Sequence, residues 1–591
     1  MKRSEVEKKY LWQIEDMYAD NAAWQKEYDE VNASVASLGE YAGKLGDKEE
    51  FLKFNRLNDE IMKKIEKIYT YAHMMADSDS GSSENCRLIA LAQRLYVYFS
   101  TTTAFTVPEI LSLSDEKINE YINDPDLKDY DYQLKTLLKS KQHVLSRDLE
   151  EMLSGVSEVT SSFMEIFQKL DNVDLPLKPV EYKGKEYPLS HGYYSMYMQS
   201  PDREFRKEVY NTYYAAYGSV LNTLTSIYYG NVKNDVFFAK AKKYDGCLEM
   251  ALSNENVDKH VYENLLEAVN KGLPTLHEYI AAKKKALDID GDMYMYDMYV
   301  PVVEDADMKL KYDDAYDYVI KALAPLGKDY QNLLKKAHDE RWIDVYETEG
   351  KRSGAYSTGC YLSHPYVLLN YTETTHDVFT IAHEMGHSIH TYFSSANQPY
   401  AKADYKIFVA EVASTVNEVL LHRYILNNVK DEKVKKYILS YFLEMIRTTL
   451  FRQTQFAEFE YEAHNLAFNG EPLTKDTLNK LYGDLNKKYY GEAVVTDDNI
   501  STEWARIPHF YTSFYVYKYA TGITSALAIA DRILNEGEPA VKDYFKFLSS
   551  GSSDSPVELL KIAGVDLNKP QVFEKAMNMF KEYLDEFNKL N

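Results

Sequence analysis

The chain has 591 residues, of which 45% are apolar, and a formal net charge of −24. This apolar content is enough for a large folded core and excludes an intrinsically disordered protein. The acidic balance argues against binding to nucleic acid or to an anionic membrane surface.

The cysteines and the first residues indicate a compartment. Cys86, Cys247 and Cys360 have no paired spacing, which favours a reducing environment. Residues 1–10 contain basic side chains but lack the apolar segment of a secretory signal. No apolar run approaches the roughly 18 residues that a membrane-spanning helix requires. We therefore expect a cytoplasmic protein that does not cross a membrane.

The first third of the chain is predicted to be helical. Residues 1–170 read as successive helices, interrupted by polar loops at 77–83 and 123–126. Two prolines then precede a pair of short alternating runs separated by Lys183 and Gly184, a pattern that indicates a small hairpin. We place a domain boundary near residue 185, which gives an N-terminal helical domain over 1–185 and a second domain over 186–591.

Strands are scarce, and the clearest ones lie in the second domain. Residues 342–346 alternate and residues 366–371 form a compact apolar run, so a small β-sheet is predicted here. Gly354 and Ala355 lie between these runs, and their small size lets another backbone come close. A strand edge at this point is suited to binding an extended peptide through backbone hydrogen bonds. A flexible solvent-exposed loop is the alternative.

The segment that follows carries the most informative motif, His383-Glu384-Met385-Gly386-His387. Its two histidines are one helical turn apart and project from one face. Two neutral imidazoles suit zinc, and Glu384 lies close enough to reach a water on the metal without being a ligand. The preceding residues lack Gly and Pro and are largely apolar, which predicts a buried helix capped by Thr374 or Thr375. The alternative is a core helix whose histidines only form hydrogen bonds.

The next helical segment, 408–421, offers a third ligand. It contains two acids, Glu411 and Glu418, that fall on nearly the same helical face. An acid within an apolar run is costly to bury unless it is paired or bound to metal. We interpret Glu411, 24 residues after His387, as the third ligand, and Glu418 as a partner that holds a ligand imidazole in one tautomer. The alternative for both acids is the solvent boundary of an amphipathic helix.

Taken together, these motifs resemble a known family. Residues 383–390, followed by 408–415, are similar to the thimet-oligopeptidase family of zinc metallopeptidases, and within it to the oligoendopeptidase F group. Further similar segments are 244–252, 350–357, 507–517 and 551–556. The resemblance covers essentially the whole chain and is weakest before about residue 110.

The resemblance has implications for fold and site. It implies a mainly α-helical, two-lobed multi-helix architecture around a deep substrate channel, with one zinc ion at the channel floor and Glu411 as the third ligand. It also implies that His509 and Tyr517 stabilise the oxyanion, and that Tyr511 and Tyr515 contact substrate. Spacing alone would not choose among these rings, and a packed aromatic helix is the alternative for each of them.

The expected function is zinc-dependent hydrolysis of internal peptide bonds in short oligopeptides, in intracellular peptide turnover. Zinc lowers the pKa of a bound water, and Glu384 takes that proton and returns it to the leaving nitrogen. A side-chain donor to the oxyanion contributes about 3 kcal/mol in other enzymes.

Two alternatives stay open. A metallocarboxypeptidase would need a cation for the substrate's free C-terminus, and Arg352 is near in sequence. A non-catalytic peptide-binding scaffold would carry a vestigial metal site. A structural zinc site is disfavoured, because such sites use four protein ligands, usually including cysteine. The oligomeric state is undetermined by the sequence.

Overall fold

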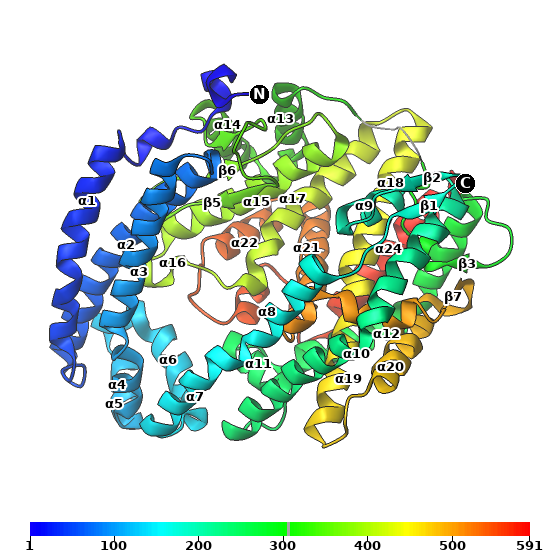
Figure 1. The fold of residues 1–591 in the computed structure, drawn as a ribbon. Coiled ribbons are helices and arrows are strands. Elements are labelled where there is room, and N and C mark those ends of the chain that lie inside the picture. The colour runs from blue at the N-terminus through cyan, green and yellow to red at the C-terminus, as the bar shows by residue number, and fades with distance from the viewer. Residues whose placement is uncertain (304–307, 591) are drawn as a thin grey trace. The chain divides into compact units, whose positions relative to one another are not determined.

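The computed structural model describes residues 1–303 and 308–590. Helices dominate these residues, and the strands form one three-stranded and two two-stranded sheets (Figure 1). The mainly α-helical class predicted from the sequence is confirmed, as is the restriction of strands to small sheets. Among the described residues, no helix combines the length and apolarity needed to cross a membrane.

Packing divides the chain into two compact units, each assembled from three segments. Unit 1 comprises Met1–Gln142, Asp307–Asn427 and Ala526–Asp566, and unit 2 comprises His143–Ala306, Asn428–Ser525 and Leu567–Asn591. Because both units are discontinuous in sequence, neither coincides with the domains expected over 1–185 and 186–591.

Unit 1 contains the long helices of the N-terminal region and the three-stranded sheet. Its helices and strands are α1 (Asn21–Ser34), α2 (Lys48–Ser78), α3 (Ser83–Thr103), α4 (Thr106–Ser112), α5 (Asp115–Asn123), α6 (Asp131–Ser140), α13 (Tyr312–Ala322), α14 (Lys328–Asp339), β4 (Ile343–Asp344), β5 (Tyr356–Thr358), β6 (Tyr366–Leu368), α15 (Thr375–Asn397), α16 (Tyr400–Ala403), α17 (Ile407–Asn428), α22 (Glu538–Leu548) and α23 (Pro556–Ile562).

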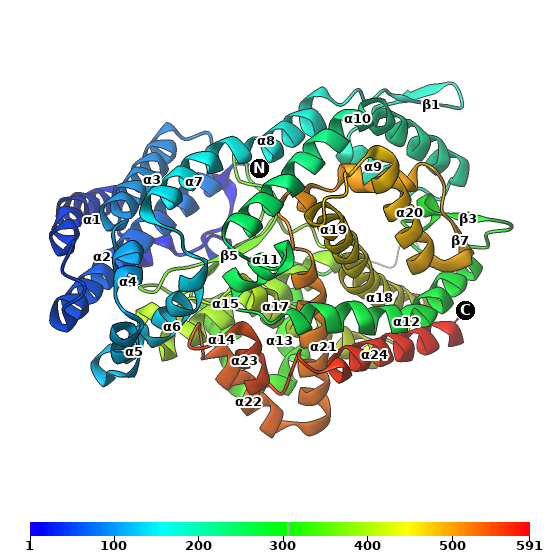
Figure 2. The same cartoon turned by 90° about the horizontal axis from the view of Figure 1, so that it is seen from below.

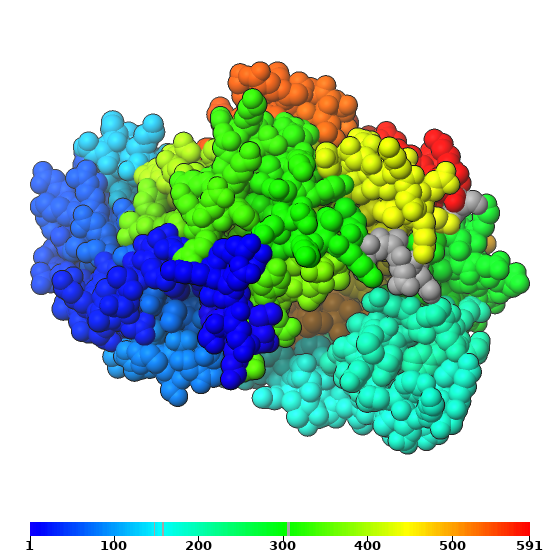
Figure 3. All heavy atoms as spheres, turned by 90° about the horizontal axis from the view of Figure 1, so that it is seen from above, coloured from blue at the N-terminus to red at the C-terminus, as the bar shows by residue number. Residues whose placement is uncertain are grey.

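The three-stranded sheet lies beside α15 and has the order β4-β6-β5. β4 runs parallel to the central strand β6, and β5 runs antiparallel to it, so β5 is an edge strand. The N-terminal segment packs along the same region, where Gln13 N–H donates to the Arg341 carbonyl at 2.7 Å and Val345 N–H donates to the Tyr10 carbonyl at 3.0 Å. Figure 3 shows this dark-blue segment against the green residues that precede the sheet.

Unit 2 is built from longer helices and two short sheets. Its elements are α7 (Arg147–Thr160), α8 (Ser162–Lys169), β1 (Val180–Tyr182), β2 (Lys185–Tyr187), α9 (His191–Tyr197), α10 (Arg203–Ala241), α11 (Cys247–Glu255), α12 (Lys259–Ala286), β3 (Met293–Tyr294), α18 (Glu432–Ile446), α19 (Arg452–Phe468), α20 (Lys475–Tyr490), β7 (Val494–Val495) and α24 (Pro570–Lys589). Helix α21 (Tyr517–Glu536) begins in unit 2 and ends in unit 1.

Two features of unit 2 follow directly from its residues. The predicted hairpin is confirmed, because β1 and β2 pair antiparallel across Lys183 and Gly184, whose φ angles are 49° and 74°. Helices α12 and α24 lie side by side in Figures 1 and 2. They approach so closely that a Cβ on Gly272 would lie 2.7 Å from the Met577 sulfur.

Candidate active site

The helix that carries the motif, α15, begins at a capping box. Asp377 N–H donates to the Thr374 hydroxyl at 3.2 Å, and Thr374 N–H donates to the Asp377 carboxylate at 3.0 Å. These bonds satisfy backbone groups that a helix start leaves unpaired. The cap therefore fixes where the helix starts, two turns before His383.

Helix α17 packs against α15 at the motif itself. Gly386 allows this approach, because a Cβ at that position would lie only 2.5 Å from the Ser414 Cα. The Asn417 side-chain amide donates to the Ala382 carbonyl at 2.9 Å, and the Tyr330 hydroxyl donates to the Asn417 side-chain oxygen at 2.9 Å. The close contact places one face of α17 alongside the two motif histidines.

The three side chains expected to hold metal lie together. The His383 and His387 Nε2 atoms are 3.2 Å apart, and Glu411 Oε2 lies 3.4 Å from the first and 3.5 Å from the second. For zinc bonds of about 2.0–2.1 Å at tetrahedral angles, ligand atoms should be about 3.3 Å apart. The donor set and its spacing fit three corners of a tetrahedral zinc site, with the fourth corner left for a non-protein ligand.

The electrostatics of this cluster follow from its burial and from mutual contacts. Burial alone would raise the pKa of Glu411, but hydrogen bonds to the two imidazoles lower it below its usual range. Burial lowers the pKa of His383, and Glu411 and Glu418 outweigh this effect and raise it well above its usual value. For Glu384, 7% exposed, burial raises the pKa.

Glu418 contacts the far side of one of these imidazoles. Its carboxylate oxygen lies 3.2 Å from His383 Nδ1. A carboxylate at this nitrogen favours the tautomer with the proton on Nδ1, which leaves Nε2 free to bind metal. His390 takes no part in the cluster: it is 1% exposed, its ring stacks on Tyr405 at 3.8 Å, and burial lowers its pKa to about 3.

The edge strand β5 lies against the same helix. The Ser357 and Ser388 hydroxyl oxygens are 2.8 Å apart and join β5 to α15. Gly354, with a φ of 86°, and Ala355 lead into this strand, and the Gly354 carbonyl accepts a hydrogen bond from the Asn370 amide at 2.8 Å. Arg352 lies nearby, but its guanidinium is 3.4 Å from Asp77 in an ion pair.

A cavity opens beside β5 within unit 1. Its volume is about 1160 Å³, and Ser357, Thr358 and Glu66 are among its lining residues. Thr391 also lines it and lies one helical turn beyond His387 on the same face of α15. The cavity therefore begins about 6 Å along the helix from the second histidine of the motif.

His509 and the aromatic residues after it belong to unit 2. His509 is half-buried in the 3-10 helix Pro508–Tyr511, where burial lowers its pKa. Its Nε2 lies 3.4 Å from the Tyr519 hydroxyl, and the Tyr515 ring packs nearby at 6.3 Å. Tyr519, which was not named from the sequence, follows Tyr515 by four residues and lies in α21.

The other two tyrosines named from the sequence pack inside unit 2. The Tyr511 ring stacks on Phe167 at 4.4 Å. Tyr517 is 1% exposed, and its ring lies 5.1 Å from that of Tyr262. The substrate and oxyanion roles of these residues stay predictions.

Comparisons with known proteins cover the whole chain. The family model "Peptidase family M3" matches residues 196–579, and "Oligopeptidase F" matches residues 109–176. The chain is 45% identical to oligopeptidase PepF of Bacillus subtilis over all of its own length and 88% of the relative's. A solved structure from Chlamydophila abortus superposes with a TM-score of 0.95 at 37% identity, covering 100% of both chains. Oligoendopeptidase F from Enterococcus faecium gives a TM-score of 0.73 at 34% identity, covering 96% of this chain and 99% of the other.

Proposed function

Because the chain belongs to peptidase family M3, we propose that it is a zinc-dependent endopeptidase that cleaves internal bonds of short peptides. The family and its relatives make it a peptidase of the oligopeptidase kind. The observation that carries the zinc proposal is the triangle of His383, His387 and Glu411 donor atoms with Glu384 next to it.

The two imidazoles and the Glu411 carboxylate would hold the ion. When bound, zinc supplies a Lewis acid that makes water more acidic and polarises a peptide carbonyl. Glu418 orients the His383 ring by accepting its Nδ1 proton in a hydrogen bond, so the ligand geometry is set before the ion binds.

Glu384 performs the proton transfers. Its carboxylate accepts a proton from the attacking water and then delivers that proton to the departing amine nitrogen. Burial raises its pKa, because the charged carboxylate loses contact with water. Glu384 lies on α15 together with His383 and His387, so the base and two of the three proposed metal ligands belong to one helix.

The edge of β5 is the proposed peptide-binding surface. Its free backbone groups would pair with an extended substrate, and Gly354 and Ala355 leave room for the substrate backbone at one end of the strand. Backbone pairing does not depend on side-chain identity, which would allow many sequences to bind. The adjacent cavity of about 1160 Å³ provides space for substrate side chains.

We further propose that His509 and Tyr517 stabilise the oxyanion and that Tyr511 and Tyr515 contact substrate. The support for these roles is the sequence resemblance. The contact between His509 and Tyr519 adds Tyr519 as another candidate donor. The role of each tyrosine is tested by changing it to phenylalanine and comparing kcat for the same peptide.

The decisive variant is Glu384→Gln. It should reduce kcat by at least about a thousandfold while zinc remains bound, since the proton acceptor is lost and the ligands are kept. Zinc content is measured by mass spectrometry of the metal, and cleavage by liquid chromatography of an unstructured peptide. The exposed Glu60, changed to Gln, is the matched control. No detectable difference between a wild-type chain and a Glu384→Gln variant that both fail to cleave the peptide would favour the binding-scaffold alternative.

The peptide fragments that the wild-type chain produces distinguish an endopeptidase from a metallocarboxypeptidase. Internal cuts support an endopeptidase, whereas ladders from the C-terminus support a metallocarboxypeptidase. A cytoplasmic location remains part of the proposal, supported by three free cysteines, of which Cys86 is exposed and Cys247 and Cys360 are buried.

A further inference from the structure

The segment that leads into β5 has little apolar packing of its own. Residues 346–355 form no helix or strand, and most of their side chains are exposed. They nevertheless carry Gly354 and Ala355, which the proposed function places beside the substrate backbone. Exposed loops with few apolar contacts are generally mobile, so an ordered binding edge requires other contacts to hold it. The segment and the metal cluster both belong to unit 1.

Lys351 is the first of these contacts. Its side chain and that of Asp344 are both fully buried, and its Nζ lies 2.7 Å from the Asp344 carboxylate. The same ammonium donates to the backbone carbonyls of Tyr346 at 2.7 Å and Asp344 at 3.2 Å. Three oxygens therefore surround a group that has three N–H donors. Arg3 contacts the other oxygen of Asp344 but is not part of the segment. Lys351 is thus the residue through which the segment is tied to this buried carboxylate.

Asn370 holds the other end of the segment. Its side-chain amide donates to the Arg352 carbonyl at 3.0 Å and to the Gly354 carbonyl at 2.8 Å, which uses both of its N–H groups. Asn370 follows β6, which ends at Leu368 and is the central strand of the sheet. The residues directly before β5 are therefore fixed to the middle of the sheet by one side chain.

The middle of the segment is joined to the end of α2. Ser80 N–H donates to the Gly350 carbonyl at 2.8 Å, and Arg352 N–H donates to the Asp77 carbonyl at 2.8 Å. Gly350 is required at this point, because its φ is 79° and a Cβ there would lie 2.6 Å from an Asp79 carboxylate oxygen. The segment is consequently held along its length and not only where it joins the strands.

We propose that Lys351 and Asn370 are positioning residues for peptide binding, an inference that rests on the proposed function. They align the edge of β5 and the two residues before it into one preformed surface for an extended backbone. Ser357 joins the same strand to α15, so this surface is also fixed beside the metal-binding helix. Because preorganisation lowers the entropy cost of binding, the two residues should act on substrate affinity and not on the chemical step.

The first test is Lys351→Met, measured with an unstructured peptide. KM should rise about tenfold, the equivalent of one or two lost backbone hydrogen bonds, while kcat and zinc content stay within about twofold of the wild type. A purely structural role has a different signature. It would reduce the fraction of folded enzyme, which lowers the apparent kcat and leaves KM unchanged.

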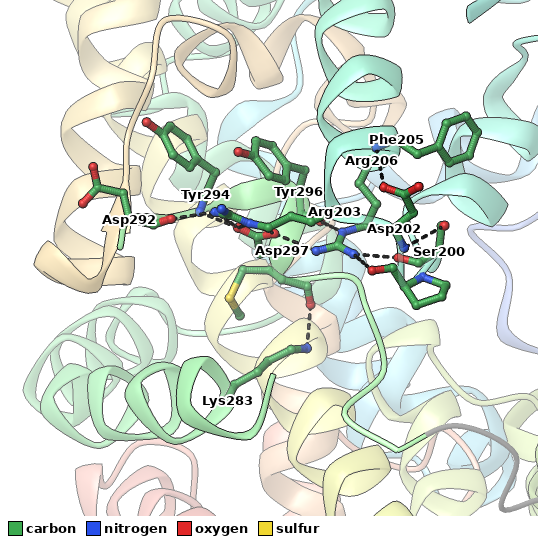
Figure 4. Close-up of polar contacts among 12 residues, drawn as sticks. Ser200, Asp202, Arg203, Phe205, Arg206, Lys283, Asp292, Tyr294, Tyr296 and Asp297 are labelled. Carbon is green, nitrogen blue, oxygen red and sulfur yellow. Dashed lines mark hydrogen bonds and ion pairs between the residues drawn. The ribbon is translucent and has the colours of Figure 1, made fainter. Parts of the chain in front are cut away.

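Lys283→Met is the matched control. Lys283 is a buried lysine of unit 2 that donates to the Met298 carbonyl at 2.6 Å (Figure 4) and lies 3.1 Å from the Glu444 carboxylate. Its replacement should lower the melting temperature about as much as Lys351→Met does, and KM should not change. An equal rise of KM in both variants would overturn the proposal, because the loss of any buried charge pair would then weaken binding.

Asn370→Ala tests the second anchor and remains informative if Lys351→Met does not fold. Asn370 is half-buried, so the substitution should be tolerated, and KM should rise severalfold at unchanged kcat. Its control is Asn264→Ala in unit 2, which removes a side-chain amide that donates to the Asn568 carbonyl at 2.9 Å. A KM that stays at the wild-type value in Asn370→Ala counts against the proposal.

A binding measurement separates this inference from the proposed function. Calorimetric titration of the Glu384→Gln variant with the peptide reports binding without turnover, and adding Lys351→Met or Asn370→Ala should raise Kd about as much as KM. If the wild type cleaves but neither change raises Kd, the positioning role is overturned and the peptidase function stands. A raised Kd without wild-type cleavage supports the positioning role and refutes the peptidase function alone. A Glu384→Gln variant that binds no peptide overturns both.

Discussion

Glu418 decides which nitrogen of His383 faces the other two donor atoms. Its carboxylate lies 3.2 Å from Nδ1, on the far side of the ring from Glu411. Without this acceptor the imidazole is free to rotate or to carry its proton on Nε2, and it would then have to rearrange before binding metal.

Changing Glu418 to Ala should therefore weaken zinc binding about 10- to 100-fold. Glu418→Gln, which keeps a carbonyl acceptor for the Nδ1 proton, should weaken it less. Competition with a chromophoric chelator measures both affinities. Activity lost in Glu418→Ala should return when zinc is added in excess, and loss that excess zinc fails to rescue would contradict a positioning role.

Glu66 is a second residue with a defined electrostatic prediction. It lines the cavity beside β5, and the Tyr400 hydroxyl donates to its carboxylate at 2.5 Å. Burial raises its pKa from 4.5 to about 6, despite the Tyr400 bond. The folded state therefore holds this proton more tightly than the unfolded state, and its contribution to stability is lost as the pH rises from about 4.5 through 6.

Replacing Glu66 by Gln should stabilise the protein by about 1–2 kcal/mol at pH 7.5 and change nothing at pH 4. Gln supplies a neutral acceptor for Tyr400 and carries no charge to desolvate. Urea denaturation at the two pH values measures the difference. Equal stabilisation at both pH values would show that charge burial is not the cause.

At the level of elements, the contact between α15 and α17 depends on one glycine. A Cβ at Gly386 would meet the Ser414 Cα at 2.5 Å and the Ala413 carbonyl oxygen at 2.7 Å. Both neighbours are backbone atoms, so no side-chain rotation can relieve the overlap. The helices must separate to admit any larger residue.

Gly386→Ala should thus destabilise unit 1 by about 1–3 kcal/mol and lower zinc affinity, because Glu411 would move away from the histidines. Gly218→Ala is the control: Gly218 lies in α10, has open space at its Cβ position, and should gain about 0.5–1 kcal/mol. Chemical denaturation and zinc titration measure both effects. A Gly386→Ala variant as stable as the wild type would contradict the close packing.

The metal-binding residues of α15 and α17 could largely be predicted from the sequence, but the contact between the two helices could not. The i, i+4 histidines, the capping residue Thr374 and the acids on the following segment are local patterns with defined spacings. The local pattern shows a glycine at 386 but does not show which helix it touches.

At the scale of the whole molecule, zinc should stabilise only one unit. All three donor residues belong to unit 1, and bound ligand stabilises the structure that contains its site. Removing metal with a chelator should therefore increase hydrogen exchange in α15 and α17 and leave α12 and α24 unchanged. Exchange measured by mass spectrometry tests this, and equal deprotection of α24 would contradict it.

The sequence predicted the helical class and the small sheets but not the division into units. Periodicity identifies each helix separately, since it depends on residues three and four apart. The assembly of unit 1 from segments that begin at residues 1, 307 and 526 depends on contacts over hundreds of residues. The change in composition near residue 185 marks the hairpin, which lies wholly inside unit 2.

The pairing of α12 with α24 has a consequence during synthesis. A ribosome that has just made Gly272 must add some 300 further residues before Met577, its contact, emerges. At a synthesis rate of 5–20 residues per second, the apolar face of α12 remains without its contact with α24 for about 15–60 seconds. Throughout that interval the exposed apolar surface favours aggregation, and a chain that ends before α24 should be prone to aggregate because unit 2 would lack this helix.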